Sequence, residues 1–139
     1  MAARTNTEIV EGIIAAFNAH DPDGLDGYVA PDVVIHGAGG QGLEGMKSDM
    51  RDFFTSFPDA HAEIQDVFDL GGTVVVRNLC GGTNTGPFFG DPPTGREISY
   101  TEIAALRIEN GKVAEAWYFV DEDSMMRQMG LARADEPVA

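Results

Sequence analysis

An acidic residue interrupts an apolar pattern in the last third of the chain. Glu102 lies in the run 98–108, in which the alternate positions Tyr100 and Ala104 are apolar. Alternation with a period of two predicts a β-strand with one buried face, and it places Glu102 on that face. Burial penalises the charged form of a carboxyl group, which raises its pKa and makes it a usable base near neutral pH. Such a group can abstract a proton next to a carbonyl, whereas a structural hydrogen bond to a neighbouring tyrosine is the alternative.

Three further side chains are candidates for the same chemistry. Tyr118 follows in the next predicted strand and could hold a developing enolate oxygen or donate a proton. His36 ends the short strand-like run 33–36, and as a neutral imidazole at the mouth of a cavity it could relay a proton. Asp121 opens the C-terminal segment, where N-capping of a helix is the alternative to catalysis.

Substrate contacts are expected from polar and apolar side chains on different elements. Asn84 lies in a loop rich in glycine and proline and could contact a substrate carbonyl or brace that loop. Tyr100 shares the expected inner face with the acidic residue. The apolar sides of two predicted helices would complete the substrate-binding wall through Phe17, Met50 and Phe54.

The sequence contains one cysteine, Cys80, which excludes an intramolecular disulfide and a cysteine-based metal site. It follows an apolar strand-like run, so we expect a small buried hydrophobic side chain. No cluster of histidine and acidic residues has metal-ligand spacing, and no glycine-rich loop has a phosphate-binding pattern. We therefore expect neither a metal nor a cofactor.

The formal net charge of −14 disfavours nucleic acids and anionic membranes as partners. A length of 139 residues suits one domain, and we expect a single domain over 1–139. The N-terminus leads into an amphipathic pattern without the apolar stretch of a secretory signal, and no apolar run is long enough for a membrane helix. These features predict a cytoplasmic protein.

Hydrophobic periodicity predicts helices in the first part of the chain and strands in the second. The helices are expected over 8–17 with Thr7 as the N-cap, 23–29 and 46–57, and the strands over 33–36, 62–70, 73–80, 98–108 and 113–120. This order predicts an α+β fold with an antiparallel sheet. In a cone-shaped α+β barrel, a curved four-stranded sheet would wrap three N-terminal helices and leave a pocket at its open end.

The turn 109–112 of the last hairpin decides which side chains share a face. Asn110-Gly111 alone suggests a two-residue loop, and a three-residue loop with Gly111 in the left-handed region is the other option. We favour the three-residue loop, in which Glu102 lies opposite Tyr118 on an inner face of small residues. The outer face, which would suit a subunit contact, then holds Ile103, Trp117 and Phe119, with Arg107 diagonal to Glu115.

Motifs along nearly the whole chain resemble the SnoaL-like polyketide cyclase family, within the nuclear-transport-factor-two-like fold superfamily. The residues that carry the resemblance are 57–59, 82–86, 90–96, 107–113, 115–117, Asp121 and 127–130. The resemblance implies a curved four-stranded sheet over three helices, and usually a homodimer through the outer sheet face. It also implies a pocket for a small apolar or aromatic molecule.

The resemblance implies chemistry without metal or cofactor. The best-known members close a polyketide ring by an intramolecular aldol reaction, and others hydroxylate, dehydrate or have no known activity. Their acid–base carboxylate corresponds to Tyr118 here, their partnering histidine to Ala104, and the histidine of the glycine-threonine motif to Asn84. This sequence thus departs from the cyclases at the residues that perform the aldol reaction.

Our first hypothesis is a cofactor-free tailoring enzyme of natural-product biosynthesis that acts on an apolar, oxygenated molecule such as a polyketide. Glu102 would be the acid–base group, assisted by Tyr118 and His36, in enolisation, ring closure or dehydration. A cofactor-independent hydroxylase of the same family is the sister alternative. A non-catalytic binding module is the second hypothesis, and epoxide hydrolysis with Glu102 and Arg77 as part of a relay is the third.

Overall fold

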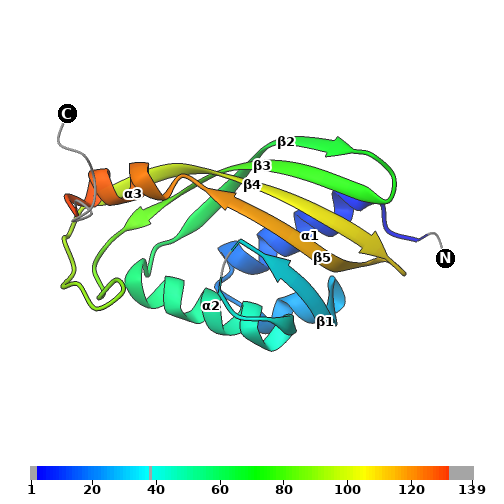
Figure 1. Ribbon diagram of the computed structural model, residues 1–139, viewed down its shortest axis with the longest axis horizontal. Helices are drawn as coiled ribbons and strands as arrows, with labels where there is room; N and C mark the ends of the chain where they lie inside the picture. Colours follow the sequence, from blue (N-terminus) through cyan, green and yellow to red (C-terminus); the bar gives the residue numbers. More distant parts are fainter. Residues whose placement is uncertain (1–2, 38, 132–139) are drawn as a thin grey trace.

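The protein folds into a curved sheet with helices on its concave side and at one end (Figure 1). The computed structural model describes residues 3–37 and 39–131. In chain order the elements are α1 (Asn6–Asn18), the 3-10 helix η1 (Pro22–Gly27), β1 (Val29–His36), α2 (Gly42–Ser56), β2 (His61–Asp69), β3 (Thr73–Thr83), β4 (Glu97–Glu109), β5 (Lys112–Val120) and α3 (Glu122–Met129). The α+β class predicted from the sequence is confirmed.

The sheet has five strands in the order β1-β5-β4-β3-β2, so the four-strand prediction is wrong. β1 is longer than the predicted run 33–36, because the chain is extended from Val29 through Pro31 instead of turning there. Pro31 fits an edge strand, which has a free side where a missing N–H is tolerated. β1 runs parallel to β5, whereas the other pairings are antiparallel. The three-helix prediction also omits α3, which follows the last strand.

The N-cap of the first helix is Thr5, two residues before the expected N-cap, Thr7. The Thr5 hydroxyl accepts a hydrogen bond from the Glu8 amide at 3.1 Å, and the Glu8 carboxylate accepts one from the Thr5 amide at 3.0 Å. This reciprocal capping box satisfies two of the backbone donors that a helix start leaves free. The pair Thr5 and Glu8 therefore fixes the start of α1 and makes Thr7 part of the helix.

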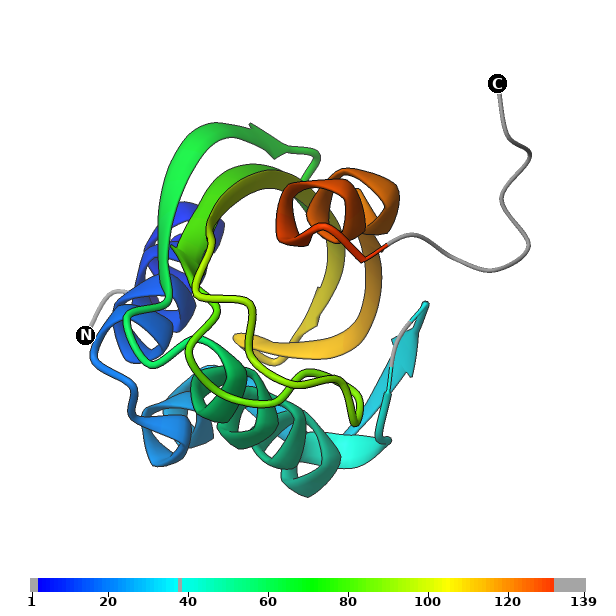
Figure 2. The ribbon, with the colours of Figure 1, turned by 90° about the vertical axis from the view of Figure 1, so that its left-hand side faces the viewer.

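The strands curl into an arch whose open side is covered by α1 and α2 (Figure 2). α1 packs along β2 and α2 packs along β1, so each of these helices covers the inner side near one edge of the sheet. Buried residues form two apolar clusters, one between α1, β1 and the middle of the sheet and one near α3. Among the described residues, no helix is long and apolar enough to cross a membrane.

The β4–β5 hairpin combines a two-residue turn with a bulge. Glu109 pairs with Lys112 around Asn110 and Gly111, both of which have positive φ, as a tight hairpin turn requires. Two pairs further on, the register shifts and Ala114 has no partner on β4. An extra residue of this kind moves all later side chains of its strand to the other face.

The predicted faces of this hairpin are correct, whereas the predicted pairs are wrong by two residues. Ala104 lies opposite Tyr118, and Glu102 lies opposite Val120. An offset of two preserves the face of every side chain, because the strand period is two. Arg107 lies directly opposite Glu115 on the outer face, where its Nε donates to the carboxylate at 3.0 Å.

Side-chain amides form hydrogen bonds with strand backbone groups at places where no neighbouring strand is available. Each of three amides accepts from the N–H and donates to the carbonyl of one strand residue, over distances between 2.6 and 3.0 Å. The pairs are Gln41 with Ile35 on β1, Asn18 with Ala62 on β2, and Gln128 with Ser99 on β4. The first two lie on the edge strands, and the third lies where β4 extends beyond the end of β5.

Deleting Ala114 removes the bulge and leaves every later pair of the hairpin in place. Without this residue, Glu115 follows Val113 and still lies opposite Arg107, so Trp117 and Phe119 stay on the outer face. We expect the free energy of unfolding to fall by about 1–3 kcal/mol in urea denaturation, because the local twist that the bulge gives the strand is lost. Ala114→Ser keeps the residue count and is the matched control, with a change below about 1 kcal/mol. A loss of more than about 4 kcal/mol in the deletion would contradict this account, because it would indicate that the later faces had reversed.

Candidate functional site

Glu102 lies on the inner face of β4, as its position in the sequence predicts. Its neighbours across the sheet are Asn78 on β3 and Val120 on β5. The Asn78 Nδ2 donates a hydrogen bond to Glu102 Oε1 at 3.4 Å. Removal from water raises the pKa of the Glu102 carboxyl, and the hydrogen bond from Asn78 offsets part of this effect. The site therefore holds a carboxyl group whose proton affinity is above that of an ordinary glutamate.

A small chamber adjoins this carboxyl group on the inner side of the sheet. Its volume is about 30 Å³. Three polar side chains and six apolar ones line it: Asn78, Glu102 and Tyr118 with Val10, Ile13, Ile14, Val76, Ala104 and Leu106. An apolar wall with a few convergent polar groups is typical of small-molecule sites.

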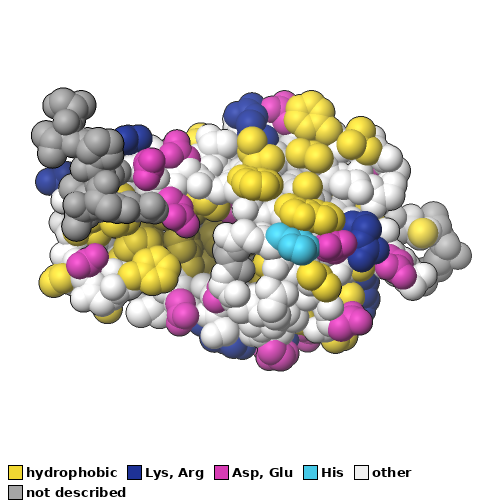
Figure 3. All heavy atoms as spheres, viewed as in Figure 1, with side chains coloured by type: hydrophobic (Ala, Val, Ile, Leu, Met, Phe, Trp, Pro, Cys, Tyr) yellow, Lys and Arg dark blue, Asp and Glu magenta, His cyan; other side chains and the backbone are white. Residues whose placement is uncertain are grey.

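Tyr118 also lines a second, wider pocket at the end of β5. The pocket has a volume of about 320 Å³ and is lined by Gly37, Tyr118, Phe119, Val120 and Glu122. Figure 3 shows a hollow with hydrophobic walls between α2 and α3. Burial, and secondarily the charge of Glu102, raise the pKa of the Tyr118 phenol, so the hydroxyl stays protonated and can donate a hydrogen bond.

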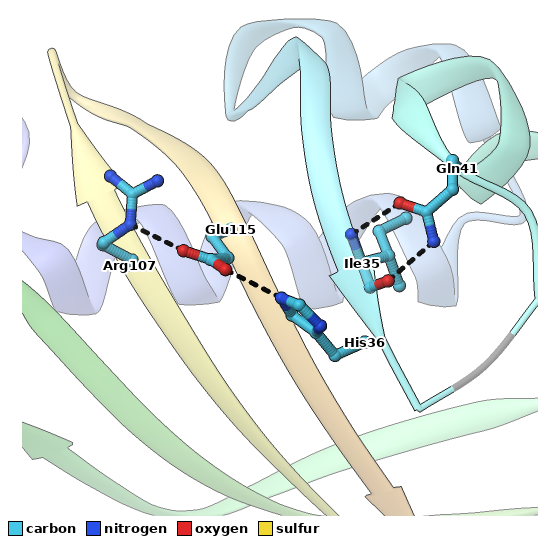
Figure 4. A network of polar contacts seen from close by, with 5 residues as sticks. All are labelled: Ile35, His36, Gln41, Arg107 and Glu115. Carbon is cyan, nitrogen blue, oxygen red and sulfur yellow. Dashed lines mark hydrogen bonds and ion pairs between the residues drawn. The ribbon is translucent and has the colours of Figure 1, made fainter.

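His36 lies outside the pocket, and its predicted position at the cavity mouth is wrong. Val33 and Ile35 of β1 are buried, and strand alternation turns His36 to the outer face. There its ring stacks on Trp117 with centroids 5.0 Å apart, and its Nε2 lies 2.7 Å from the Glu115 carboxylate (Figure 4). These contacts place His36 in the surface network of the sheet, away from Glu102.

Asp121 and Asn84 have structural partners that account for their positions. The exposed Asp121 carboxylate accepts a hydrogen bond from the Ser124 amide at 3.1 Å and caps α3. Asn84 is fully buried, and its side chain donates to the carbonyls of Ser56 and Gly86 and accepts from the amide and hydroxyl of Thr94. Asn84 thus braces the loops beside α2, and neither residue lines the chamber.

The aromatic side chains that we expected to contact substrate pack mainly against one another. Phe17 lies 5.1 Å from Phe54 between ring centroids, and Phe54 stacks on His20 at 4.1 Å. Tyr100 is buried with its ring 6.4 Å from that of Phe53. Met50 packs against the other apolar cluster. These side chains fill the space between α1, α2 and the sheet, so the chamber lies further along β4 than predicted.

Sequence reasoning missed Asn78, which is the closest polar neighbour of Glu102. It is 1% exposed, and its Oδ1 is a buried acceptor with no hydrogen-bond partner in the described part of the chain. The signal was present, because Val74, Val76 and Asn78 occupy alternate positions of one strand. A polar residue in a row of inward-facing apolar side chains indicates a candidate site residue, as it does for Glu102.

Other chemistries that the sequence suggested lack the required groups at this site. Arg77 lies on the outer face, where its Nε donates to Asp66 at 2.8 Å, so it cannot join Glu102 in an epoxide-hydrolase relay. Cys80 is buried as expected, and burial raises the pKa of its thiol to about 12, so it remains protonated. Within 3–37 and 39–131, no group of three histidine, cysteine or acidic side chains is placed to hold a metal ion.

Comparison with protein families gives one match that covers most of the chain. Residues 7–129 match the family model described as SnoaL-like polyketide cyclase. Among curated proteins, nogalonic acid methyl ester cyclase from Streptomyces nogalater is 26% identical over 125 residues, which make up 85% of this chain and 92% of that protein.

Solved structures with the same fold cover both chains almost completely. TsrD from Streptomyces laurentii is 30% identical with a TM-score of 0.85, over 91% of this chain and 95% of that one. IdmH from Streptomyces antibioticus, a candidate polyketide cyclase, is 30% identical with a TM-score of 0.81, over 92% and 100%. AclR from Streptomyces galilaeus, a candidate hydroxylase, is 26% identical with a TM-score of 0.82, over 94% and 87%.

Proposed function

This chain belongs to the SnoaL-like polyketide cyclase family, and from that membership we propose that it is a cofactor-free tailoring enzyme with Glu102 as its acid–base group. One observation carries the proposal: an ionisable carboxyl group lies in the wall of a mainly apolar chamber. Catalytic carboxyl groups that exchange protons near neutral pH require such surroundings. The substrate class is an apolar, oxygenated small molecule of natural-product biosynthesis.

The proposed reaction begins with enolisation. The Glu102 carboxylate removes a proton from the carbon next to a substrate carbonyl, and the Tyr118 hydroxyl donates a hydrogen bond to the enolate oxygen that forms. Because the pKa of Tyr118 is raised by burial, its proton stays on the phenol while negative charge develops beside it. The enolate carbon then attacks a second carbonyl in ring closure, or the molecule loses a leaving group.

The position of the base differs from that in the cyclases this sequence resembles. Their carboxylate and histidine correspond to Tyr118 and Ala104, which lie directly opposite each other in the sheet. Glu102 is the next inward-facing residue of β4 after Ala104, and Asn78 is its cross-strand neighbour. Relative to those cyclases, the proposed proton-transfer group therefore lies at the neighbouring inward-facing position of β4, Glu102 instead of 104, within the same pocket.

Hydroxylation is a second candidate, favoured by the likeness to AclR, a candidate hydroxylase. An electron-rich substrate would then react with molecular oxygen after Glu102 has removed its proton. Oxygen uptake measured beside product formation separates hydroxylation from ring closure, because ring closure consumes no oxygen.

We also propose that a second copy of this chain covers the outer sheet face. Hydrophobic side chains gather there (Figure 3), and Ile103 and Phe119 are 41% and 65% exposed. Single apolar side chains at a surface are ordinary, but a contiguous group on one face of a sheet is typical of a subunit interface. Sedimentation equilibrium should give a dimer for the native chain and a monomer for Phe119→Lys. A native monomer would contradict the interface.

Glu102→Gln tests the proposed base. The amide preserves the shape of the side chain but cannot accept a proton, so we expect kcat/KM to fall by about 100-fold or more while ligand affinity is retained. Glu97→Gln, an exposed change of the same kind on the same strand, is the control and should leave both unchanged. Product formation and calorimetric binding are the measurements. Binding without turnover by the native protein on every aromatic and polyketide candidate would indicate a binding module instead.

The raised pKa of Glu102 also predicts how activity and stability depend on pH. The base form appears only as pH rises through the folded-state pKa, so the acid limb of kcat/KM should lie above the usual range for glutamate. The folded state favours the protonated form, so ionisation destabilises it as pH rises above the ordinary carboxyl pKa. Glu102→Gln should therefore gain thermal stability relative to the native protein at pH 8 and not at pH 4. An acid limb at an ordinary glutamate pKa would argue that the carboxyl is solvated.

A further inference from the structure

A buried acceptor in the chamber wall has no hydrogen-bond donor among the described protein groups. Asn78 Oδ1 has no hydrogen-bond partner within the described residues, although the side chain is 1% exposed. The Nδ2 of the same amide already donates to Glu102. A buried acceptor without a donor is costly, and native proteins almost always supply a partner or a bound molecule at such a position.

The size of the chamber limits what this partner can be. A cavity needs a volume of about 10–15 Å³ to hold one water molecule, and the volume of the chamber is about 30 Å³. It therefore accommodates one oxygen atom with its immediate neighbour, and not a ring. The larger part of any substrate would therefore lie outside the chamber, in the wider pocket that Tyr118 also lines.

The polar groups around this volume select the kind of oxygen. Asn78 Oδ1 accepts and has no proton to give, so its partner must be a donor. Glu102 exchanges a proton at the same place, and Tyr118 lines the side toward the wider pocket. Water and hydroxyl groups meet these conditions, whereas ether and carbonyl oxygens cannot donate.

We propose that the chamber binds one hydrogen-bearing oxygen, a water molecule in the resting protein and the leaving hydroxyl of a β-hydroxy ketone during turnover, with Asn78 as the residue that recognises it. This inference rests on the proposed role of Glu102 and selects dehydration among the reactions that an enolising base can support.

The step balances with Glu102 alone as acid and base. Its carboxylate takes the proton from the carbon between the carbonyl and the carbinol carbon, and the electron pair of that bond forms the new C=C bond. The carbinol C–O bond breaks, and the departing hydroxyl takes the proton from the Glu102 carboxyl group. The products are a conjugated ketone and water, which donates to Asn78 Oδ1, and Glu102 is a carboxylate again.

Crystal structures test the resting state without any substrate. The unliganded native protein should show a water molecule within hydrogen-bond distance of Asn78 Oδ1 and Glu102. Asn78→Leu, which is close in shape and apolar, should lose it; Asn78→Ala replaces this variant if the leucine protein does not fold. A chamber without ordered water in the native crystal would overturn the proposal.

Two simple ketones separate the recognition of the hydroxyl from the action of the base. The aldol of acetone and benzaldehyde loses water to give a conjugated ketone that absorbs in the near ultraviolet. Benzylacetone has no hydroxyl, and its exchange of α-protons for deuterium, followed by NMR, reports on Glu102 alone. Both rates are measured above the acid limb of the exchange reaction, because losing the Asn78 donor shifts the pKa of Glu102 upward.

We expect Asn78→Leu to lower kcat/KM for dehydration at least tenfold more than it changes the rate of deuterium exchange. Thr101→Val, a polar-to-apolar change on the outer face of β4, is the control and should alter neither rate. Native exchange without dehydration, or an equal loss of both rates in Asn78→Leu, would overturn the inference and leave the proposed function intact. If the native protein catalyses neither reaction, the proposed function fails as well.

Discussion

The interior of this protein depends on one residue of β5, Ala114, that has no partner on β4. Because side chains alternate between the two faces of a strand, this extra residue decides which later side chains of β5 face inward. If Ala114 were paired with β4, the tight Asn110-Gly111 turn would place Trp117 and Phe119 opposite Ala104 and Glu102. Those two rings would occupy the volume that the chamber now uses. With the bulge, small and medium side chains face inward beside a single tyrosine, and the large rings remain on the outer face. The cavity is thus a consequence of strand register as much as of side-chain size.

The same arrangement keeps Glu102 in surroundings that oppose its ionisation. Its one protein partner among the described residues is Asn78, through a long hydrogen bond of 3.4 Å. Charged pairs that could lower its pKa lie on the opposite face, where Arg107 bonds Glu115 and Arg77 bonds Asp66. The sheet therefore separates ion-paired charges on its outer face from the poorly solvated carboxyl group of Glu102 on its inner face. Apolar packing of the core must offset the cost of that acid.

The sequence predicted those features that follow from local periodicity. Alternation in 98–108 predicts that Glu102 faces inward, and the same alternation in β3 groups Asn78 with the inward-facing Val74 and Val76. It also turns His36 to the outer face, because its neighbour Ile35 is buried. The pairing of β1 with β5 and the hydrogen bond from Asn84 to the end of α2 depend on segments far apart in the chain. No local pattern contains such contacts, so only the folded structure shows them.

The amides of Gln41, Asn18 and Gln128 give the open sheet a property that its strands alone would lack. An exposed strand edge can recruit a strand from another molecule, which is the usual beginning of amyloid-like aggregation. Each of these amides occupies both backbone groups of one residue on a free edge or overhang and so blocks that route with a single side chain. Deamidation would replace the donating nitrogen by an oxygen facing the strand carbonyl and would reopen the edge. Each deamidation would therefore leave the backbone groups of one strand residue free to pair with a strand of another molecule.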